Sequence, residues 1–236
     1  MKLGIMQPYF FPYIGYFSLI KHTDEFILLD TVQFIRHGWI ERNRILKPSD
    51  GWQYIMVPLK KHSRETLIKN IEINNEQQWK EKILAQLQHY KKQAPYFSNV
   101  IDILNEIFSK EYATIVDLNL ASLKTVCYYL GINTSFQVFY LMNIDIEPAN
   151  APDEWALNIC KALGNIDEYW NLSGGQSFFD RKKYENAGIN LKFHSAILTE
   201  YDQKRNVFEP GLSIIDVMMF NSVEEINKML DNYELL

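Results

Sequence analysis

The sequence predicts an α/β fold with a parallel, Rossmann-like sheet, helices on both faces and a helical insertion. An apolar run (residues 3–6), a helix-like segment (14–21) and a second apolar run (26–30) follow one another at the start of the chain. Strand, helix and strand within about 30 residues are typical of a parallel βαβ unit. The same alternation returns later, as helix 152–163, strand 168–172, helix 180–187 and strand 189–193. Since no repeat or linker interrupts the chain, we expect one domain over residues 1–236.

The middle of the chain is expected to be mostly helical. Trp79, Ile83, Leu87 and Tyr90 recur at helical spacing, and two further helices are expected at 97–108 and 115–129. Gly131 stands where a left-handed helix cap is favoured. These segments form the predicted insertion, at about 77–131. The remaining expected elements are strands at 52–59 and 135–140 and helices at 213–219 and 222–231.

Composition excludes several classes of protein. Hydrophobic residues make up 47% of the chain and charged residues 22%, as in ordinary globular proteins. Cys127 and Cys160 show no paired motif, so we interpret both as packing residues in a reducing compartment. The five histidines have no metal-ligand spacing, and no apolar stretch approaches the length of a membrane span. We expect a cytoplasmic protein without a metal site or an integral membrane segment; the sequence does not indicate a cofactor or an oligomeric state.

Charge is unevenly distributed. The chain carries a net charge of −5, yet residues 36–64 hold seven Lys or Arg against Glu41 and Asp50, a local charge of +5. The overall negative charge argues against nucleic-acid binding. Arginine pairs bidentately with phosphate or carboxylate, so this segment predicts a phosphorylated or carboxylated small-molecule substrate. Its expected ligand-binding residues are Arg36, Trp39, Arg42, Asn43, Arg44 and Lys60, with Gln33 just before them; a solvated surface is an equal alternative for Lys60, Lys61 and Arg64.

Aromatic residues crowd the turn after the first expected strand. Six of the nine residues between 9 and 17 are aromatic. Such a turn can pack the core or stack against a flat or sugar-like ligand. We assign Phe10, Phe11 and Phe17 to the core. The binding candidates here are Gln7, Tyr9, Tyr13, Gly15 and Tyr16, where Gly15 allows close approach of a ligand or a helix.

Other candidates lie near the same predicted sheet edge. Asp30 ends a strand where α/β enzymes often place a functional carboxylate, and His62 is a possible general base. Asp30 could equally cap the next turn, and a lone histidine is usually structural. Glycines in the loop that joins a strand to a helix can free backbone N–H groups for an anion; this loop contributes Ser173, Gly174 and Gly175. We interpret Ser213 and Asp216 as a helix cap, and Asn119 as a structural residue that needs a partner.

Several of these segments together resemble one family. The opening, Ile5–Phe17 (IMQPYFFPYIGYF), is similar to that of the WbqC-like family. Similarity continues through residues 30–34 (DTVQF), 42–45 (RNRI), 57–61 (VPLKK), 90–97 (YKKQAPYF), 130–132 (LGI), 172–175 (LSGG) and 212–216 (LSIID). The resemblance implies a bacterial protein of surface polysaccharide (O-antigen) biosynthesis. It implies transfer of an acyl or aminoacyl group to an activated amino sugar.

A weaker resemblance involves only one loop. Tyr13-Ile14-Gly15-Tyr16 is placed like the His-x-Gly-His loop of nucleotidylyltransferases and pantothenate synthetases. Tyrosine donates a hydrogen bond but cannot supply the positive charge of an imidazolium. Three functions therefore remain open: a transferase, a non-catalytic binding or assembly protein for polysaccharide enzymes, and a divergent nucleotidylyltransferase.

Overall fold

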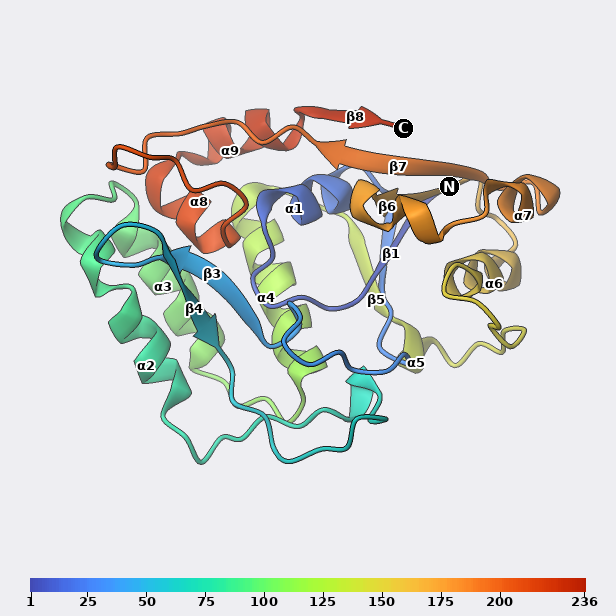
Figure 1. Cartoon of the computed structure of the whole chain (residues 1–236), viewed down its shortest axis with the longest axis horizontal. Helices are drawn as coiled ribbons and strands as arrows, with labels where there is room; N and C mark the ends of the chain where they lie inside the picture. Colours follow the sequence, from blue (N-terminus) through green and yellow to red (C-terminus); the bar gives the residue numbers. More distant parts are fainter.

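A mostly parallel six-stranded sheet forms the centre of the protein (Figure 1), in a computed structural model that describes residues 1–236. The strand order is β5-β2-β1-β6-β7-β8, and only β8 runs antiparallel to its neighbour. The strands are β1 (Lys2–Met6), β2 (Glu25–Leu28), β5 (Ser135–Val138), β6 (Glu168–Leu172), β7 (Asn190–Ala196) and β8 (Tyr233–Leu235). The predicted Rossmann-like α/β class is confirmed.

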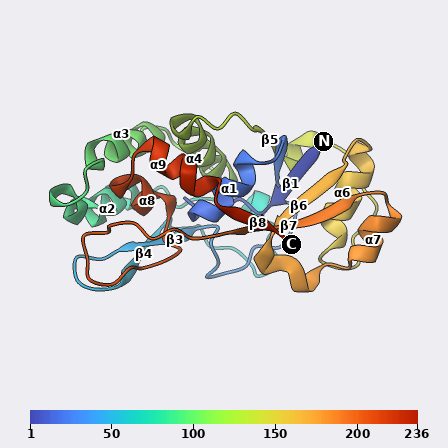
Figure 2. The same ribbon diagram turned by 90° about the horizontal axis from the view of Figure 1, so that it is seen from above.

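Helices cover both faces of the sheet because side chains alternate along its strands. Phe26 and Leu28 pack into a large cluster with helices α1 (Ile14–Lys21), α4 (Ile115–Leu130), α8 (Ile214–Phe220) and α9 (Val223–Leu230). Ile27 packs into a smaller cluster with α5 (Phe139–Met142), α6 (Glu154–Leu163) and α7 (Arg181–Asn186). Figure 2 shows α6 and α7 on the opposite side of the sheet from α9 and α4.

The segment between β2 and β5 is larger and less purely helical than expected. It contains an antiparallel hairpin of β3 (Arg42–Leu46) and β4 (Trp52–Met56), and a short 3₁₀ turn η1 (Ile68–Asn70). These are followed by α2 (Trp79–Gln86), a 3₁₀ turn η2 (Gln88–Lys92) and α3 (Phe97–Phe108), and then by α4. Strand β3 was not predicted, because three polar residues, Arg42, Asn43 and Arg44, fill its first positions.

Several predicted boundaries were wrong. The predicted helix through Tyr90 ends at Gln86 and continues as η2, and the predicted strand 52–59 ends at Met56, before Pro58. Strand 135–140 ends at Val138, where the chain turns into α5. The predicted strand 189–193 in fact extends to Ala196, where it pairs with β8, a strand that was not predicted.

Helix caps were predicted with mixed success. Gly131 has φ of +73° and closes α4, as expected. Ser213 caps α8, since its side chain accepts the N–H of Ile215. The Asp216 side chain does not take part in the cap; it is fully buried and accepts hydrogen bonds from two tyrosines.

Both cysteines are buried and unpaired. None of the helices combines the length and the apolar character needed to cross a bilayer.

Candidate functional site

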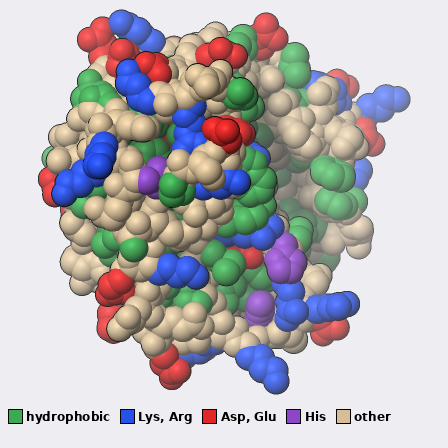
Figure 3. Space-filling model, turned by 60° about the vertical axis from the view of Figure 1, so that its left-hand side comes forward, with side chains coloured by type: hydrophobic (Ala, Val, Ile, Leu, Met, Phe, Trp, Pro, Cys, Tyr) green, Lys and Arg blue, Asp and Glu red, His purple; other side chains and the backbone are tan.

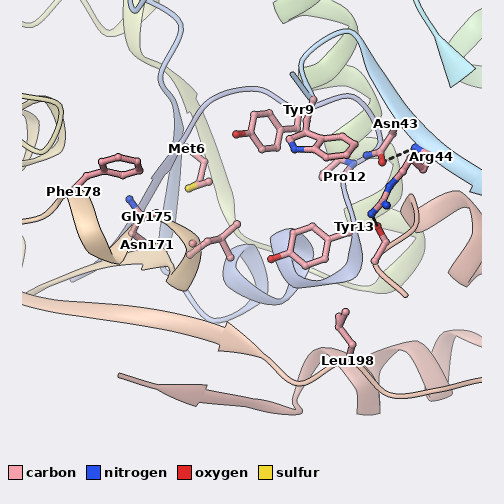
Figure 4. Close-up of a pocket in the computed structure, with 14 residues that line it drawn as sticks. Met6, Tyr9, Pro12, Tyr13, Asn43, Arg44, Asn171, Gly175, Phe178 and Leu198 are labelled. Carbon is pink, nitrogen blue, oxygen red and sulfur yellow. Dashed lines mark hydrogen bonds between the residues drawn. The ribbon is translucent and has the colours of Figure 1, made fainter. Parts of the chain in front are cut away.

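A cavity of about 570 Å³ opens at the carboxyl ends of β1 and β6. Strands β1 and β6 are neighbours in the sheet but far apart in sequence, so their connections leave in different directions. Open α/β sheets bind ligands at such a switch point. Figure 4 shows the cavity between the aromatic turn, β3 and the loops after β6 and β7. Its lining residues are Met6, Tyr9, Pro12, Tyr13, Trp39, Asn43, Arg44, Asn171, Leu172, Gly174, Gly175, Phe178, Leu198 and Gly211.

The aromatic turn is held by side-chain amides that bind its carbonyl groups. Asn43 donates from Nδ2 to the carbonyls of Phe10 (3.1 Å) and Phe11 (2.9 Å). Asn119 donates to the carbonyls of Pro8 and Ile40, both at 2.9 Å. The expected structural role of Asn119 is therefore confirmed: from the middle of α4 it joins the turn to the segment before β3.

A tight backbone conformation places the turn. Phe11 has φ of +40°, which is unusual for a residue with a side chain. The Ser213 hydroxyl donates to the carbonyl of Phe11 (2.8 Å), and Ile214 N–H donates to that of Pro12 (2.9 Å). The start of α8 and Asn43 therefore fix the turn together, since both donate to the carbonyl of Phe11. Phe10, Phe11 and Phe17 are buried, as predicted.

Tyr13 faces the cavity because Gly15 leaves room for its ring. A Cβ atom on Gly15 would lie 2.4 Å from the Tyr13 ring. Figure 4 shows the hydroxyl ends of Tyr9 and Tyr13 directed toward the side of the cavity where Met6 and Asn171 lie. Burial raises the pKa of both phenols, so at neutral pH they are protonated and can donate hydrogen bonds.

Tyr16 and Gln7, two other predicted binding residues, do not line the cavity. Tyr16 is fully buried, its ring centroid lies 5.5 Å from that of Tyr9, and its hydroxyl donates to the carbonyl of Gln7 (2.7 Å). Only the first tyrosine of the Tyr-Ile-Gly-Tyr loop therefore reaches the cavity. This separation weakens the comparison with the His-x-Gly-His loop, in which both side chains contact phosphate.

Arg44 is the only charged side chain in the lining. Its guanidinium carbon lies 5.4 Å from the ring centroid of Trp39 and 5.2 Å from that of Trp52. One terminal nitrogen donates to the carbonyl of Gly211 (3.1 Å), whereas Nε is buried without a partner. None of the ion pairs in the molecule involves Arg44. No carboxylate of the chain pairs with this half-buried guanidinium and its Nε–H has no acceptor, so an anion in the cavity can bind there.

The rest of the predicted basic segment lies outside the lining. Arg36 is exposed and donates to the carbonyl of His62 (3.0 Å), and Arg42 lies over the Tyr54 ring. Gln33 donates to the carbonyl of Arg64 (2.6 Å). Lys60 forms an exposed ion pair with Glu72 (2.6 Å). Of this segment, the fold brings Trp39, Asn43 and Arg44 to the cavity.

The two catalytic candidates are also separated from the cavity. Asp30 is 2% exposed and accepts the N–H of Tyr140 (3.0 Å) in α5, so it holds the start of that helix and does not cap the turn after β2, as the alternative had it. Burial raises the pKa of Asp30. His62 packs edge-on against Phe34 and burial lowers its pKa. Neither residue lines the cavity.

The loop after β6 contributes backbone and amide groups. Gly174 and Gly175 line the cavity at the start of the 3₁₀ turn η3 (Ser173–Phe178), whereas Ser173 points toward Ser195 (3.4 Å between hydroxyl oxygens). Asn171, which we did not predict, donates to the Tyr169 hydroxyl (2.7 Å). Phe178, at the end of η3, was also missed, and so were Leu198 and Gly211, which come from loops without a motif.

A buried carboxylate organises the elements behind Arg44. Asp216 accepts hydrogen bonds from the hydroxyls of Tyr90 (2.6 Å) and Tyr201 (2.5 Å) and from the Gln203 amide (3.1 Å). The Tyr90 hydroxyl in turn accepts the N–H of Leu46, at the end of β3. Asp216 thus connects β3 to the loop that carries Gly211.

The lining can recognise a ligand better than it can exchange protons. It contains phenols, amides, an indole and one guanidinium, but no carboxylate, imidazole or thiol side chain. No three His, Cys, Asp or Glu side chains gather as a metal-binding group. Chemistry in this cavity would therefore rely on groups carried by the substrate.

Comparison with known proteins gives a family and no activity. The model of the WbqC-like protein family matches residues 7–228. A protein of Mycobacterium tuberculosis (strain ATCC 25618 / H37Rv), named Uncharacterized protein Rv1507c, is 32% identical over 228 residues, which cover 93% of each chain. No solved structure matches the protein. The chain belongs to the WbqC-like protein family.

Proposed function

We propose that the cavity binds an activated amino sugar and that the protein is a transferase of bacterial surface polysaccharide (O-antigen) biosynthesis. The acyl or aminoacyl group that it transfers would be joined to the amine of the sugar. The observation that carries the proposal is the unpaired Arg44 guanidinium in a lining that is otherwise aromatic and amide-rich. Arg44 would bind the phosphate of the activated sugar, because a guanidinium pairs with phosphate through two parallel hydrogen bonds.

The size and chemistry of the cavity agree with such a ligand. Small-molecule sites usually measure about 300–1,000 Å³ and carry a few convergent polar groups on an apolar wall. Here the rings of Tyr9 and Tyr13 can pack against the apolar face of a sugar. Their hydroxyls and the amide of Asn171 can hydrogen-bond to its hydroxyl groups.

Direct transfer suits a lining without a nucleophile or a base. The sugar amine, once deprotonated by solvent, attacks the carbonyl carbon of an acyl donor such as a thioester. The new N–C bond forms while the bond to the leaving group breaks. The leaving group takes the electron pair, and it also takes up, through solvent, the proton that the nitrogen loses. The protein contributes orientation and a phenol hydrogen bond to the carbonyl oxygen.

A second candidate function is a non-catalytic binding protein for polysaccharide enzymes. The same absence of acid and base side chains from the lining favours it. The transferase requires a ligand at Arg44 and turns it over, whereas a binding or assembly protein associates with a polysaccharide enzyme without turnover.

The test is a thermal-shift screen of sugar 1-phosphates, nucleotide-sugars and acyl-coenzyme A compounds. A ligand at about 100 times its Kd stabilises a protein by about 2.7 kcal/mol, or roughly 5–10 °C at this size. We expect a shift that Arg44→Ala abolishes and that Arg36→Ala, on the exposed surface, retains. Turnover is then measured as transfer of a labelled acyl group. Equal shifts in both variants would remove Arg44 from the site and contradict the proposal.

A further inference from the structure

The outward face of the β3–β4 hairpin carries exposed aromatic side chains. Trp52 and Tyr54 alternate with inward residues along β4, and 38% and 36% of their surfaces are exposed. Their ring centroids lie 5.0 Å apart, with an interplanar angle of 70°. Figure 3 shows Lys and Arg side chains interspersed with hydrophobic ones on the face formed by the left-hand part of Figure 1. Two neighbouring aromatic rings open to solvent offer a stacking surface.

Arg42 adds a positive charge to this surface. Its guanidinium carbon lies 4.2 Å from the Tyr54 ring centroid, and its Nε donates to the carbonyl of Gly38 (3.3 Å). Like Arg44, it takes part in none of the molecule's ion pairs. We call Arg42, Trp52 and Tyr54 the hairpin strip. It combines planar rings with a cation that forms no ion pair, although the neighbouring Glu41 carboxylate interacts with it electrostatically.

The hairpin strip continues directly from the cavity. Arg44 lines the cavity and contacts both Trp39, which also lines it, and Trp52, which does not. A ligand that placed an anionic group at Arg44 would therefore have one end in the cavity and the other beside Trp52. The anion of that ligand stands between its two ends.

We propose that the hairpin strip binds the base of a nucleoside diphosphate-linked sugar, whose sugar lies in the cavity and whose diphosphate lies at Arg44. This inference rests on the proposed function, and it assigns the activating group of the substrate. In such a molecule the phosphates separate a planar base from a sugar. The protein has the matching surfaces in the same order: the hairpin strip for the base, Arg44 for the phosphates and the cavity for the sugar. A base can stack on the Trp52 indole, while the Tyr54 ring, inclined at 70° to the indole, meets the edge of the base. Arg42 provides further positive charge near the phosphates.

Other occupants fit the strip less well. A neutral glycan or an acyl chain could cover the rings, but it would leave Arg42 and Arg44 without an anion. A single-stranded nucleic acid has both bases and phosphates, yet it would meet a chain with a net charge of −5.

The test compares two sets of probes by isothermal titration calorimetry: glucosamine 1-phosphate, and the nucleotides UDP, dTDP and GDP. We expect at least one nucleotide to bind more tightly than the sugar phosphate. Trp52→Ala should weaken that nucleotide about tenfold or more and the sugar phosphate much less, because the sugar phosphate loses only the contact between the indole and Arg44, whereas the nucleotide also loses its stacking surface. Trp52→Phe, which keeps a ring, should retain most of the affinity. Tyr128→Ala, which removes an exposed aromatic residue of α4, is the matched control.

The outcomes separate this inference from the proposed function. If the sugar phosphate binds in an Arg44-dependent way and Trp52→Ala weakens no nucleotide, the hairpin strip is not a base site. The same conclusion follows if no nucleotide binds better than the sugar phosphate, or if oligo(dT) binds more tightly than the mononucleotides. If Arg44→Ala changes the binding of neither probe set, the proposed function itself is wrong. Thermal unfolding of each variant confirms that it is folded.

Discussion

Replacing Gly15 with alanine should destabilise the protein, although alanine is the better helix former. Gly15 lies in the first turn of α1. In the interior of a helix, alanine stabilises the folded state by about 1 kcal/mol relative to glycine, and near a helix end it stabilises it by less. In this protein the added Cβ would lie 2.4 Å from the Tyr13 ring, which must move. Tyr13 is held against the cavity by the turn, so the movement is costly.

The magnitude follows from two opposing effects. Overpacking costs about 1–3 kcal/mol, and helix propensity returns up to about 1 kcal/mol. We therefore expect Gly15→Ala to lower the free energy of unfolding by about 1–2 kcal/mol. In a Tyr13→Ala background the clash is absent, and the same substitution should raise it by up to about 1 kcal/mol. The coupling between the two sites is then about 2 kcal/mol.

Urea denaturation of the four proteins of this double-mutant cycle measures the coupling. The m-values must agree, so that differences in midpoint report stability. If Gly15→Ala has the same effect with and without the Tyr13 ring, the placement of Tyr13 against α1 is wrong. Ligand titrations of the Gly15→Ala protein then report whether displacement of the ring also weakens binding.

Three other substitutions test the interior. Asn43→Ala removes the donor for the carbonyls of Phe10 and Phe11 and should cost about 3 kcal/mol in urea denaturation; a loss below about 1 kcal/mol would show that the turn does not depend on Asn43. Burial raises the pKa of Asp216 from 3.8 to about 6, so the folded state binds a proton more readily than the unfolded state. As pH rises from 4 to 7, the free energy of unfolding of the wild type should therefore fall by up to about 3 kcal/mol relative to that of Asp216→Asn. Parallel pH profiles of the two unfolding free energies would contradict this. Burial lowers the pKa of His194 from 6.5 to about 4, so its contribution is lost as pH falls from about 6.5 toward 4. Over that interval the free energy of unfolding of the wild type should fall by up to about 3 kcal/mol relative to that of His194→Gln. A difference in unfolding free energy that stays constant with pH would refute this prediction.

The sheet could be predicted because its central strands are regular apolar runs. Strands β1, β2 and β6 are buried on both faces, and helices such as α3 and α6 carry clear apolar stripes. Strand β3 could not be recognised, since its first three residues, Arg42, Asn43 and Arg44, are polar and only Ile45 and Leu46 are apolar. The exposed three-residue strand β8 carries no such pattern at all.

The candidate site could be predicted only where its residues are close in sequence. Aromatic density marked the turn with Tyr9 and Tyr13, and local charge marked Arg44. Strand order could not be read from the sequence: the cavity lies where β1 meets β6, while Asp30 follows β2 on the far side of β1. A carboxylate that follows a strand therefore lies near the cavity only if that strand is β1 or β6.

The central claim is that Arg44 holds the anionic group of a sugar ligand in the cavity. A crystal structure with the compound that gives the largest thermal shift tests it most directly. We predict a phosphate within about 3 Å of the Arg44 guanidinium, with the sugar between Tyr13 and Asn171. A ligand bound instead to the exposed basic surface around Lys60 and Arg64, with the cavity empty, would contradict the account.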